Sequence, residues 1–327
     1  MAPTELTYRQ AIALALAEEM RRDPRVLLMG EDIGASGGPL KTTEGLHAEF
    51  GPERVRDTPI SENAFVGAAL GLAIMGYRPV VEIMFADFLG VCYDQIVNSI
   101  AKHRFMSGGR MDAPLVIRAI GGGGLRFGAQ HSQTAETWFM PVPGLKIVSA
   151  SSPNEVYGML KAAIRDPDPV LLIEHKGLLG VKGPVYVGQD NLLPLKGTNL
   201  LRGGDHATVV ASLGMVPRAL EAAGILAGEG IGLDVFDLRA IRPMDTSDIV
   251  ESVKRTNRLL TVEEVSLVGG WGAEVCARVT AGAFEYLDAP PQRLGLPEHP
   301  LPYSPALEDA AIPDAAAIVR AVRELLA

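Results

Sequence analysis

Short apolar runs that alternate with helix-like segments constrain the fold of this chain more than any other feature of its sequence. The runs at residues 25–30, 78–84 and 170–174 are rich in aliphatic and β-branched residues and lack the strict polar–apolar alternation of a strand with one wet face. Strands of this kind are buried on both faces, as in parallel sheets covered by helices. The sequence therefore predicts an α/β fold with largely parallel sheets. Further strands are expected at 113–118, 145–149, 207–212, 232–237 and 258–262, and helices from Thr7 onward and at 43–50, 62–75, 153–165, 216–227 and 246–255.

A change in composition divides this pattern into two parts. Residues 177–204 are rich in glycine, proline and polar residues, and the strand–helix pattern resumes at Ala207. A chain of 327 residues is also longer than one typical domain. We therefore predict two three-layer α/β domains, at residues 1–185 and 205–327, joined by a linker at 186–204.

Charge and cysteine content exclude several classes of function. The formal charge of -9 argues against a nucleic-acid or anionic-membrane surface, because either partner requires a basic face. Cys92 and Cys276 lie far apart and have no metal-binding spacing, which argues against a disulfide framework or a zinc site and favours a reducing compartment such as the cytoplasm. The first residues lack the pattern of a signal peptide, and no run of roughly 20 apolar residues predicts a membrane span.

The common catalytic motifs are missing. The sequence contains no GxxxxGK[ST] loop, no GxGxxG between a strand and a helix, no GxSxG elbow and no HExxH pair. Three other segments are therefore the candidates for chemistry.

The first segment reads DTPISENAF and begins at Asp57. Pro59 disfavours a helix before it, and Ser61 is expected to cap the apolar helix that follows. Glu62 then lies in the first helical turn, where the ordinary interpretation is compensation of the helix dipole. The functional interpretation is a partly buried carboxylate that exchanges a proton with a cofactor.

The second segment, residues 82–90, follows the strand expected at 78–84. Ligands of parallel sheets gather at the carboxyl ends of strands. Met84 and Phe88 offer a sulfur atom and an aromatic face to a flat ring, although core packing explains such residues equally well.

The third segment runs from four consecutive glycines, 121–124, to AQHSQ at 129–133. So many glycines allow a close approach of the backbone to a ligand, or a mobile loop. His131 closes the segment, and histidine changes its charge near neutral pH, as acid–base catalysis requires. The alternative is a structural histidine.

Taken together and in order, these segments resemble a known family. The motifs are DTPISE, EIMFADF followed by YDQIVN, GGGG followed by AQHSQ, then PGLKIV and AAIRDPDPVLLIEHK. They are similar to the beta subunits of the thiamine-diphosphate-dependent first component of 2-oxo acid and acetoin dehydrogenase complexes. The likeness extends from the first helix to Pro302-Tyr303. It implies a transketolase-like pyrimidine-binding domain followed by a transketolase C-terminal-like domain.

The resemblance also implies roles for individual residues. Glu62 matches the catalytic carboxylate that bonds to a pyrimidine nitrogen of thiamine diphosphate. Phe88 matches the aromatic residue that packs on that ring, and Ile60 and Met84 its other apolar neighbours. His131 matches the active-site histidine near the substrate, which is implicated in transfer of the acyl group to a lipoyl arm.

Partners follow from what the sequence lacks. The Gly-Asp-Gly motif that holds magnesium and the diphosphate in thiamine enzymes is absent; Gly203-Gly204-Asp205-His206 does not match it. The resemblance therefore implies that an alpha subunit supplies Mg²⁺ and the diphosphate site in an α2β2 heterotetramer, and that the beta chain alone is inactive. The C-terminal domain is expected to serve assembly and docking of the lipoyl-bearing acyltransferase core. Family members also bind potassium at positions that match Leu115, Ala163, Ile164, Asp166 and Asp168, the last of which is commonly Asn in relatives.

The substrate and the reaction class leave alternatives. The MFADFLGVCYDQ stretch is most similar to pyruvate and acetoin dehydrogenase beta subunits, whereas branched-chain enzymes tend to have Gln and Tyr at the positions of Met84 and Phe88. We therefore expect pyruvate or acetoin as substrate and rank branched-chain 2-oxo acids third. Two alternatives are a split transketolase-type ketol transferase and a non-catalytic scaffold subunit.

Overall fold

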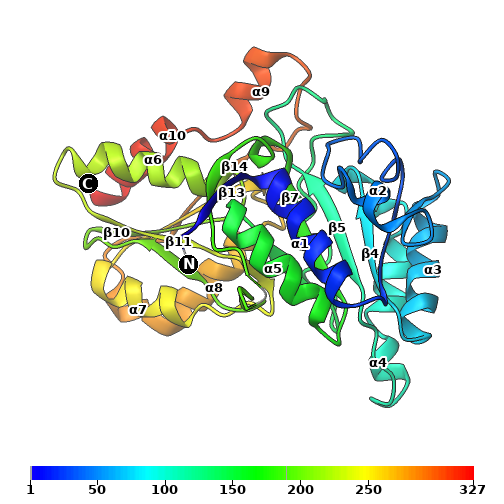
Figure 1. The fold of residues 1–327 in the computed structure, drawn as a ribbon. Coiled ribbons are helices and arrows are strands. Elements are labelled where there is room, and N and C mark those ends of the chain that lie inside the picture. Colours follow the sequence, from blue (N-terminus) through cyan, green and yellow to red (C-terminus); the bar gives the residue numbers. More distant parts are fainter. Residues whose placement is uncertain (1, 189) are drawn as a thin grey trace. The chain divides into compact units, whose positions relative to one another are not determined.

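The chain divides into two compact units in the computed structural model, which describes residues 2–188 and 190–327 (Figure 1). The first unit consists of residues 1–121 and 138–195, and the second of residues 122–137 and 196–327. The boundary at 195 falls within the linker expected at 186–204. The second unit, however, includes residues 122–137, which lie inside the first predicted domain, whereas the sequence predicted two consecutive domains.

The first unit is built on six parallel strands in the order β6-β7-β5-β4-β2-β3. Their interior positions are almost all buried, which is why the runs carry no alternation. Strand β5 begins at Val116 and not at Ala113, because Pro114 cannot donate to a neighbouring strand. The strands are β2 (Val26–Gly30), β3 (Val55–Asp57), β4 (Arg78–Ile83), β5 (Val116–Gly121), β6 (Lys146–Ser149) and β7 (Val170–His175).

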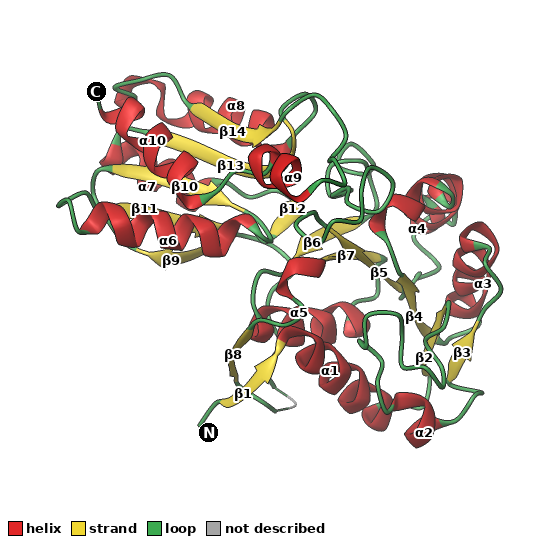
Figure 2. Cartoon of the chain, turned by 90° about the horizontal axis from the view of Figure 1, so that it is seen from above, coloured by secondary structure: helices red, strands yellow, loops and turns green. Residues whose placement is uncertain are grey.

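Helices cover both faces of this sheet. Helices α1 (Tyr8–Arg22) and α5 (Pro153–Arg165) pack together on one face, and α3 (Glu62–Ile74) lies on the other (Figure 2). Helix α1 starts where the sequence predicted, and Thr7 caps it: its Oγ1 accepts from the Gln10 N–H at 3.3 Å, and Gln10 Oε1 accepts from the Thr7 N–H at 2.9 Å. The remaining elements are β1 (Thr4–Thr7), paired antiparallel with β8 (Lys182–Val185), α2 (Leu46–Phe50), η1 (Ala86–Gly90), η2 (Gln95–Ile100), α4 (His103–Met106) and η3 (Lys176–Leu178).

A buried group of charges crosses the middle of the sheet. Arg118 on β5 donates to Glu174 Oε1 and Oε2 on β7 at 2.7 and 2.8 Å, and to Glu82 Oε2 on β4 at 2.6 Å. Thr42 Oγ1 also donates to Glu82 Oε2, at 2.7 Å. The three charged side chains are almost completely buried, so the guanidinium is the counter-charge that allows two carboxylates inside the sheet.

The second unit has its own sheet, in the order β14-β13-β10-β11-β9, with only β9 antiparallel. Helices α6 (Met215–Ala227) and α10 (Ala315–Leu326) cover one face, and α7 (Ser247–Thr256) and α8 (Trp271–Ala283) the other (Figure 1). Strand β9 lies in the segment expected to be a linker, because a short edge strand has little sequence signal. The other elements are β9 (Asn199–Arg202), β10 (Ala207–Ala211), β11 (Leu233–Asp237), β12 (Ala240–Arg242), β13 (Leu259–Ser266), η4 (Phe284–Tyr286), β14 (Gln292–Leu296) and α9 (Pro305–Ala311).

The fold class is thus confirmed: two α/β units, each with a largely parallel sheet between helices. Within the described residues, no helix has the length and apolar character needed to cross a bilayer.

Candidate functional site

The carboxyl ends of three neighbouring strands define the site of the first unit. The register places Asp57 at the end of β3 beside Gly30 at the end of β2, and Gly30 beside Glu82 of β4. The segments that leave these strands contain the candidates from the sequence, namely 58–62 and 83–88. They meet at one edge of the sheet because parallel strands all end on the same side.

Glu62 is the first residue of α3 and only 6% exposed. Ser61 occupies the N-cap position, but its hydroxyl accepts no hydrogen bond from the helix, so the predicted side-chain cap is wrong. The first turn of α3 therefore keeps backbone N–H groups without a side-chain cap, and the Glu62 carboxylate lies beside them. Burial raises the pKa of two neighbouring groups, Glu31 and Cys92, and the negative charge of Glu62 raises the pKa of each further.

Glu31 is a site residue that the sequence analysis missed. It follows β2 directly, and burial raises the pKa of its carboxyl, as do the charges of Glu62 and Asp32. Its Oε1 is buried without a hydrogen-bond partner among the described residues. The signal was present, because an acid that directly follows a buried parallel strand points to the edge where ligands bind.

Apolar and aromatic groups lie on the segment that follows β4 at the same edge. Met84 and Phe88 are half-buried, and the Phe88 ring packs edge-on against Phe85, with ring centroids 5.8 Å apart. Ile60, which precedes α3, is 86% exposed. A buried carboxylate, an unsatisfied second carboxyl oxygen and half-buried apolar faces together fit a flat heterocycle with polar ring nitrogens.

His131 belongs to the second unit, in the segment 122–137. It is half-buried, and its N–H donates to the Gly128 carbonyl at 3.4 Å. Four of the predicted site residues, Ile60, Glu62, Met84 and Phe88, therefore gather at one sheet edge, whereas the fifth is carried by the other unit.

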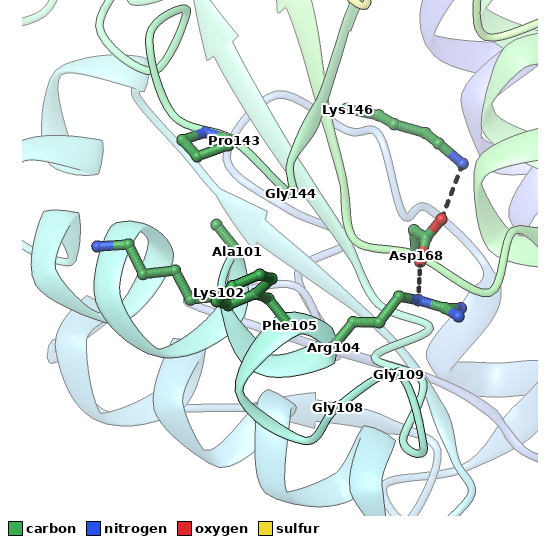
Figure 3. A pocket seen from close by; sticks show the side chains of 10 residues that line it. All are labelled: Ala101, Lys102, Arg104, Phe105, Gly108, Gly109, Pro143, Gly144, Lys146 and Asp168. Carbon is green, nitrogen blue, oxygen red and sulfur yellow. Dashed lines mark hydrogen bonds and ion pairs between the residues drawn. The ribbon is translucent and has the colours of Figure 1, made fainter.

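Of the predicted potassium ligands, Asp168 lines a pocket of about 900 Å³ in the first unit, where Lys146 and Arg104 contact its carboxylate (Figure 3). Protein cations contact oxygens of other predicted ligands as well. Lys146 Nζ lies 2.7 Å from both carboxylate oxygens of Asp166 and 3.4 Å from Asp168 Oδ2. Arg104 Nε donates to Asp168 Oδ1 at 2.6 Å. Arg78 Nη1 donates to the carbonyls of Ile164 and Asp166, at 2.7 and 3.2 Å. The Leu115 and Ala163 carbonyls accept from the backbone N–H groups of Val170 and Asp166.

Because the Asp166 and Asp168 side chains face Lys146 and Arg104, their negative charge is already compensated. The oxygen set therefore fits a monovalent cation poorly. No cluster of three or more His, Cys, Asp or Glu side chains suited to a metal ion occurs in the described part of the chain.

Two family models match the chain. The transketolase pyrimidine-binding domain matches residues 4–182, and the transketolase C-terminal domain matches residues 197–318. The two matches meet near the boundary at 195.

Curated relatives share nearly half of the residues along almost the whole chain. The beta subunit of acetoin:2,6-dichlorophenolindophenol oxidoreductase from Cupriavidus necator is 45% identical, over 98% of both chains. Mitochondrial pyruvate dehydrogenase E1 component subunit beta-2 from Oryza sativa is 45% identical, over 98% of this chain and 86% of the relative. Pyruvate dehydrogenase E1 component subunit beta from Rhizobium meliloti is 44% identical, over 97% of this chain and 69% of the relative.

Solved structures show the same fold. A split-gene transketolase, described as an inactive β4 tetramer, superimposes with a TM-score of 0.78 at 27% identity, over 98% of both chains. A transketolase mutant from Pichia stipitis superimposes with a TM-score of 0.72 at 17% identity, over the full chain but only 46% of that enzyme. This chain belongs to the transketolase-related family of beta subunits from the thiamine-dependent first components of pyruvate and acetoin dehydrogenase systems.

Proposed function

We propose that the chain is the beta subunit of a dehydrogenase component that uses thiamine diphosphate to cleave pyruvate or acetoin and passes the acyl unit to a lipoyl group. The observation that carries this proposal is the buried Glu62 at the start of α3, at the same sheet edge as the half-buried Met84 and Phe88. Relatives with the same two domains are named for pyruvate and for acetoin.

The residues of the first unit fit the pyrimidine ring of the cofactor. When bound, thiamine diphosphate supplies a carbon nucleophile and an electron sink. Glu62 holds a proton at a ring nitrogen, and its place on a buried helix turn keeps the carboxylate fixed while the proton moves. Phe88 and Met84 pack on the ring and exclude water from it. Glu31 is a second buried acid at the same edge, and the charge of Glu62 acts on its carboxyl. His131 is the acid–base group nearest the substrate in this proposal.

The remaining requirements are assigned to partners. An alpha subunit holds the diphosphate through Mg²⁺, in an α2β2 assembly that is inactive without it, and a lipoyl-bearing acyltransferase core accepts the product. The missing Gly-Asp-Gly motif supports this division. Cytoplasmic localisation stays a prediction, because relatives include bacterial and mitochondrial proteins.

Potassium also stays a prediction, at Leu115, Ala163, Ile164, Asp166 and Asp168. A thermal midpoint of the α/β pair that rises when potassium replaces sodium or choline at equal ionic strength would support an ion at this site. Equal thermal midpoints in the three salts would contradict a bound ion. The contacts from Lys146 and Arg78 to the predicted ligands favour equal midpoints.

A Glu62→Gln variant tests the function. The amide preserves shape but cannot exchange the proton, so turnover of the reconstituted α/β pair should fall on the order of 10²–10⁴-fold. Glu251→Gln is the matched control, because the Glu251 carboxylate is exposed and pairs with Lys254 on its own helix. Full turnover by Glu62→Gln would favour the scaffold alternative.

Substrate preference is tested on the same preparation. Pyruvate and acetoin should be turned over faster than branched-chain 2-oxo acids, and the opposite ranking would reverse our assignment. The likeness to a split-gene transketolase keeps one further candidate, a ketol transferase. Turnover of sugar phosphates without any lipoyl acceptor would identify it.

A further inference from the structure

Residues 122–137, the segment that carries His131, form hydrogen bonds to the rest of the second unit near both ends. These bonds, with those of Glu308 below, are the fastening of the segment. At the first end, the Gly123 N–H donates to Glu264 Oε1 at 2.6 Å. A Cβ on Gly123 would lie 2.6 Å from Leu301 Cδ1 and 2.8 Å from Ile312 Cδ1, so the backbone at this glycine packs closely against the side chains of the second unit. At the other end, Thr134 donates to the Glu264 carbonyl.

Between these ends, one carboxylate holds three donors of the segment. Glu308 on α9 is completely buried. Its Oε1 accepts from the Gly124 N–H at 3.0 Å, and its Oε2 accepts from the Arg126 N–H at 3.2 Å and from Arg126 Nη1. Asp309, the next residue, accepts from Arg126 Nη2 at 2.7 and 2.8 Å but is largely exposed.

Glu308 binds a stretch of backbone in the left-handed conformation, which the segment would not adopt without these hydrogen bonds. Arg126 has a φ of 66°, and Gly124 and Gly128 have φ values of 86° and 72°. A left-handed conformation costs a residue with a side chain about 1–2 kcal/mol. Charge-assisted hydrogen bonds to a buried carboxylate are strong enough to offset this cost.

From these contacts we infer that Glu308 is a positioning residue for His131. It fixes the left-handed turn at residues 124–126, and this turn sets the course of the chain to His131. The inference rests on the proposed function only for the role of His131; the fastening itself is a property of this chain.

Protease sensitivity of the full chain tests the fastening without any activity measurement. Phe127 is 41% exposed and adjoins Arg126, so chymotryptic cleavage after Phe127 reports opening of the segment. Glu308→Gln and Arg126→Ala should each raise that cleavage rate on the order of tenfold, which corresponds to the loss of one or two charge-assisted hydrogen bonds. Arg126→Lys should restore most of the protection. Asp309→Asn, the neighbour on the same helix, should resemble the wild type.

Kinetics of the reconstituted α/β pair test the effect on His131. Glu308→Gln and Arg126→Ala should lower kcat roughly tenfold with little change in KM or in the thermal midpoint, whereas a purely structural role would lower the midpoint. Unchanged cleavage in both variants would overturn the inference, and so would raised cleavage with unchanged kcat. If His131→Ala keeps full turnover, only the proposed role of His131 fails, and the cleavage result still decides the fastening. Should Glu308→Gln not fold, the two Arg126 variants decide alone.

Discussion

Glu136 is a carboxylic acid buried in the second unit, where two neutral side chains donate to it. Its Oε1 accepts from Trp271 Nε1 at 2.7 Å and from Ser212 Oγ at 3.0 Å, and its Oε2 is buried without a partner among the described residues. Burial raises the pKa of this carboxyl to about 7; the two hydrogen bonds act in the opposite direction, and the charges of Glu263 and Glu264 raise it further. The acid is therefore largely protonated at mildly acidic pH.

This pKa makes stability depend on pH in a defined direction. The folded chain binds the proton more tightly than the unfolded chain, whose glutamate has a pKa near 4.5. The contribution is therefore complete below about pH 4.5 and is lost as the pH rises to about 7, a change of roughly 3 kcal/mol. Glu136→Gln should be the more stable protein at pH 8, and the difference should vanish near pH 5. Thermal midpoints across this range measure it, with Glu251→Gln as control; parallel curves for wild type and variant would contradict the assignment.

The two cysteines should differ from an ordinary thiol in reactivity. Burial raises the pKa of Cys92 to about 12 and that of Cys276 to about 11, and Cys92 is completely enclosed. Because the thiolate is the reactive form, the folded chain should be alkylated on the order of a hundredfold more slowly at pH 8 than the urea-unfolded chain, and Cys92 more slowly than Cys276. Peptide mass spectrometry after timed alkylation gives both rates. Fast modification of Cys92 in the folded chain would show that its enclosure opens readily.

For single residues, the sequence predicted those whose type and local context are unusual. It missed those that become unusual only through contacts with distant segments. Glu62 was recognisable as an acid at the start of an apolar helix. Glu136 and Glu308 were not, because nothing local to them indicates a buried position against a distant segment. Ser61 was assigned a cap that its hydroxyl does not make.

Among the elements, the central strands of the first sheet depend on the ion group of Arg118. Removing the guanidinium would leave Glu82 and Glu174 buried without their counter-charge. Arg118→Met should therefore destabilise the chain by about 3–5 kcal/mol, measured by urea unfolding. Arg323→Met, which breaks an exposed ion pair with Glu229, should cost less than about 1 kcal/mol. Replacing all three charged residues of the sheet by apolar ones should recover most of the loss, and failure to do so would mean that the ion group has a role beyond compensation.

Helix boundaries followed local chemistry closely. The prediction for α5 matched residue for residue, because Ser152 caps it and Pro153 occupies its first position. Strand β5 was displaced by Pro114, and β9 was missed because an edge strand of four residues has no periodic pattern long enough to recognise. Propensity and pattern specify long elements; pairing partners specify short ones.

For the whole molecule, the main departure from the sequence prediction is the membership of residues 122–137 in the second unit. Local patterns contain no information on which sheet a loop will pack against. The contacts that decide it join backbone N–H groups to acids more than 100 positions away in the chain. The two-domain organisation was thus predictable, but its discontinuity was not.

A fragment of residues 196–327 should show this dependence. Trp271 is the only tryptophan in that fragment, and in the whole chain it is completely buried with its Nε1 on Glu136. Without residues 122–137 the indole loses this partner and its cover, so its fluorescence should shift to longer wavelength. Fusing residues 122–137 to the fragment through a flexible glycine linker should reverse the shift. A fragment whose emission already equals that of the fusion would contradict the dependence.

The same discontinuity fixes the order in which residues 122–137 and their hydrogen-bond partners are synthesised. The ribosome produces residues 122–137 before the acids that hold them, and Glu308 follows Gly124 by 184 positions. At about 5–20 residues per second, the segment waits on the order of ten seconds or longer for its partners. His131 is therefore held by Glu308 only after α9 has been made, so a chain cut short before α9 would have a finished first sheet and an unplaced His131.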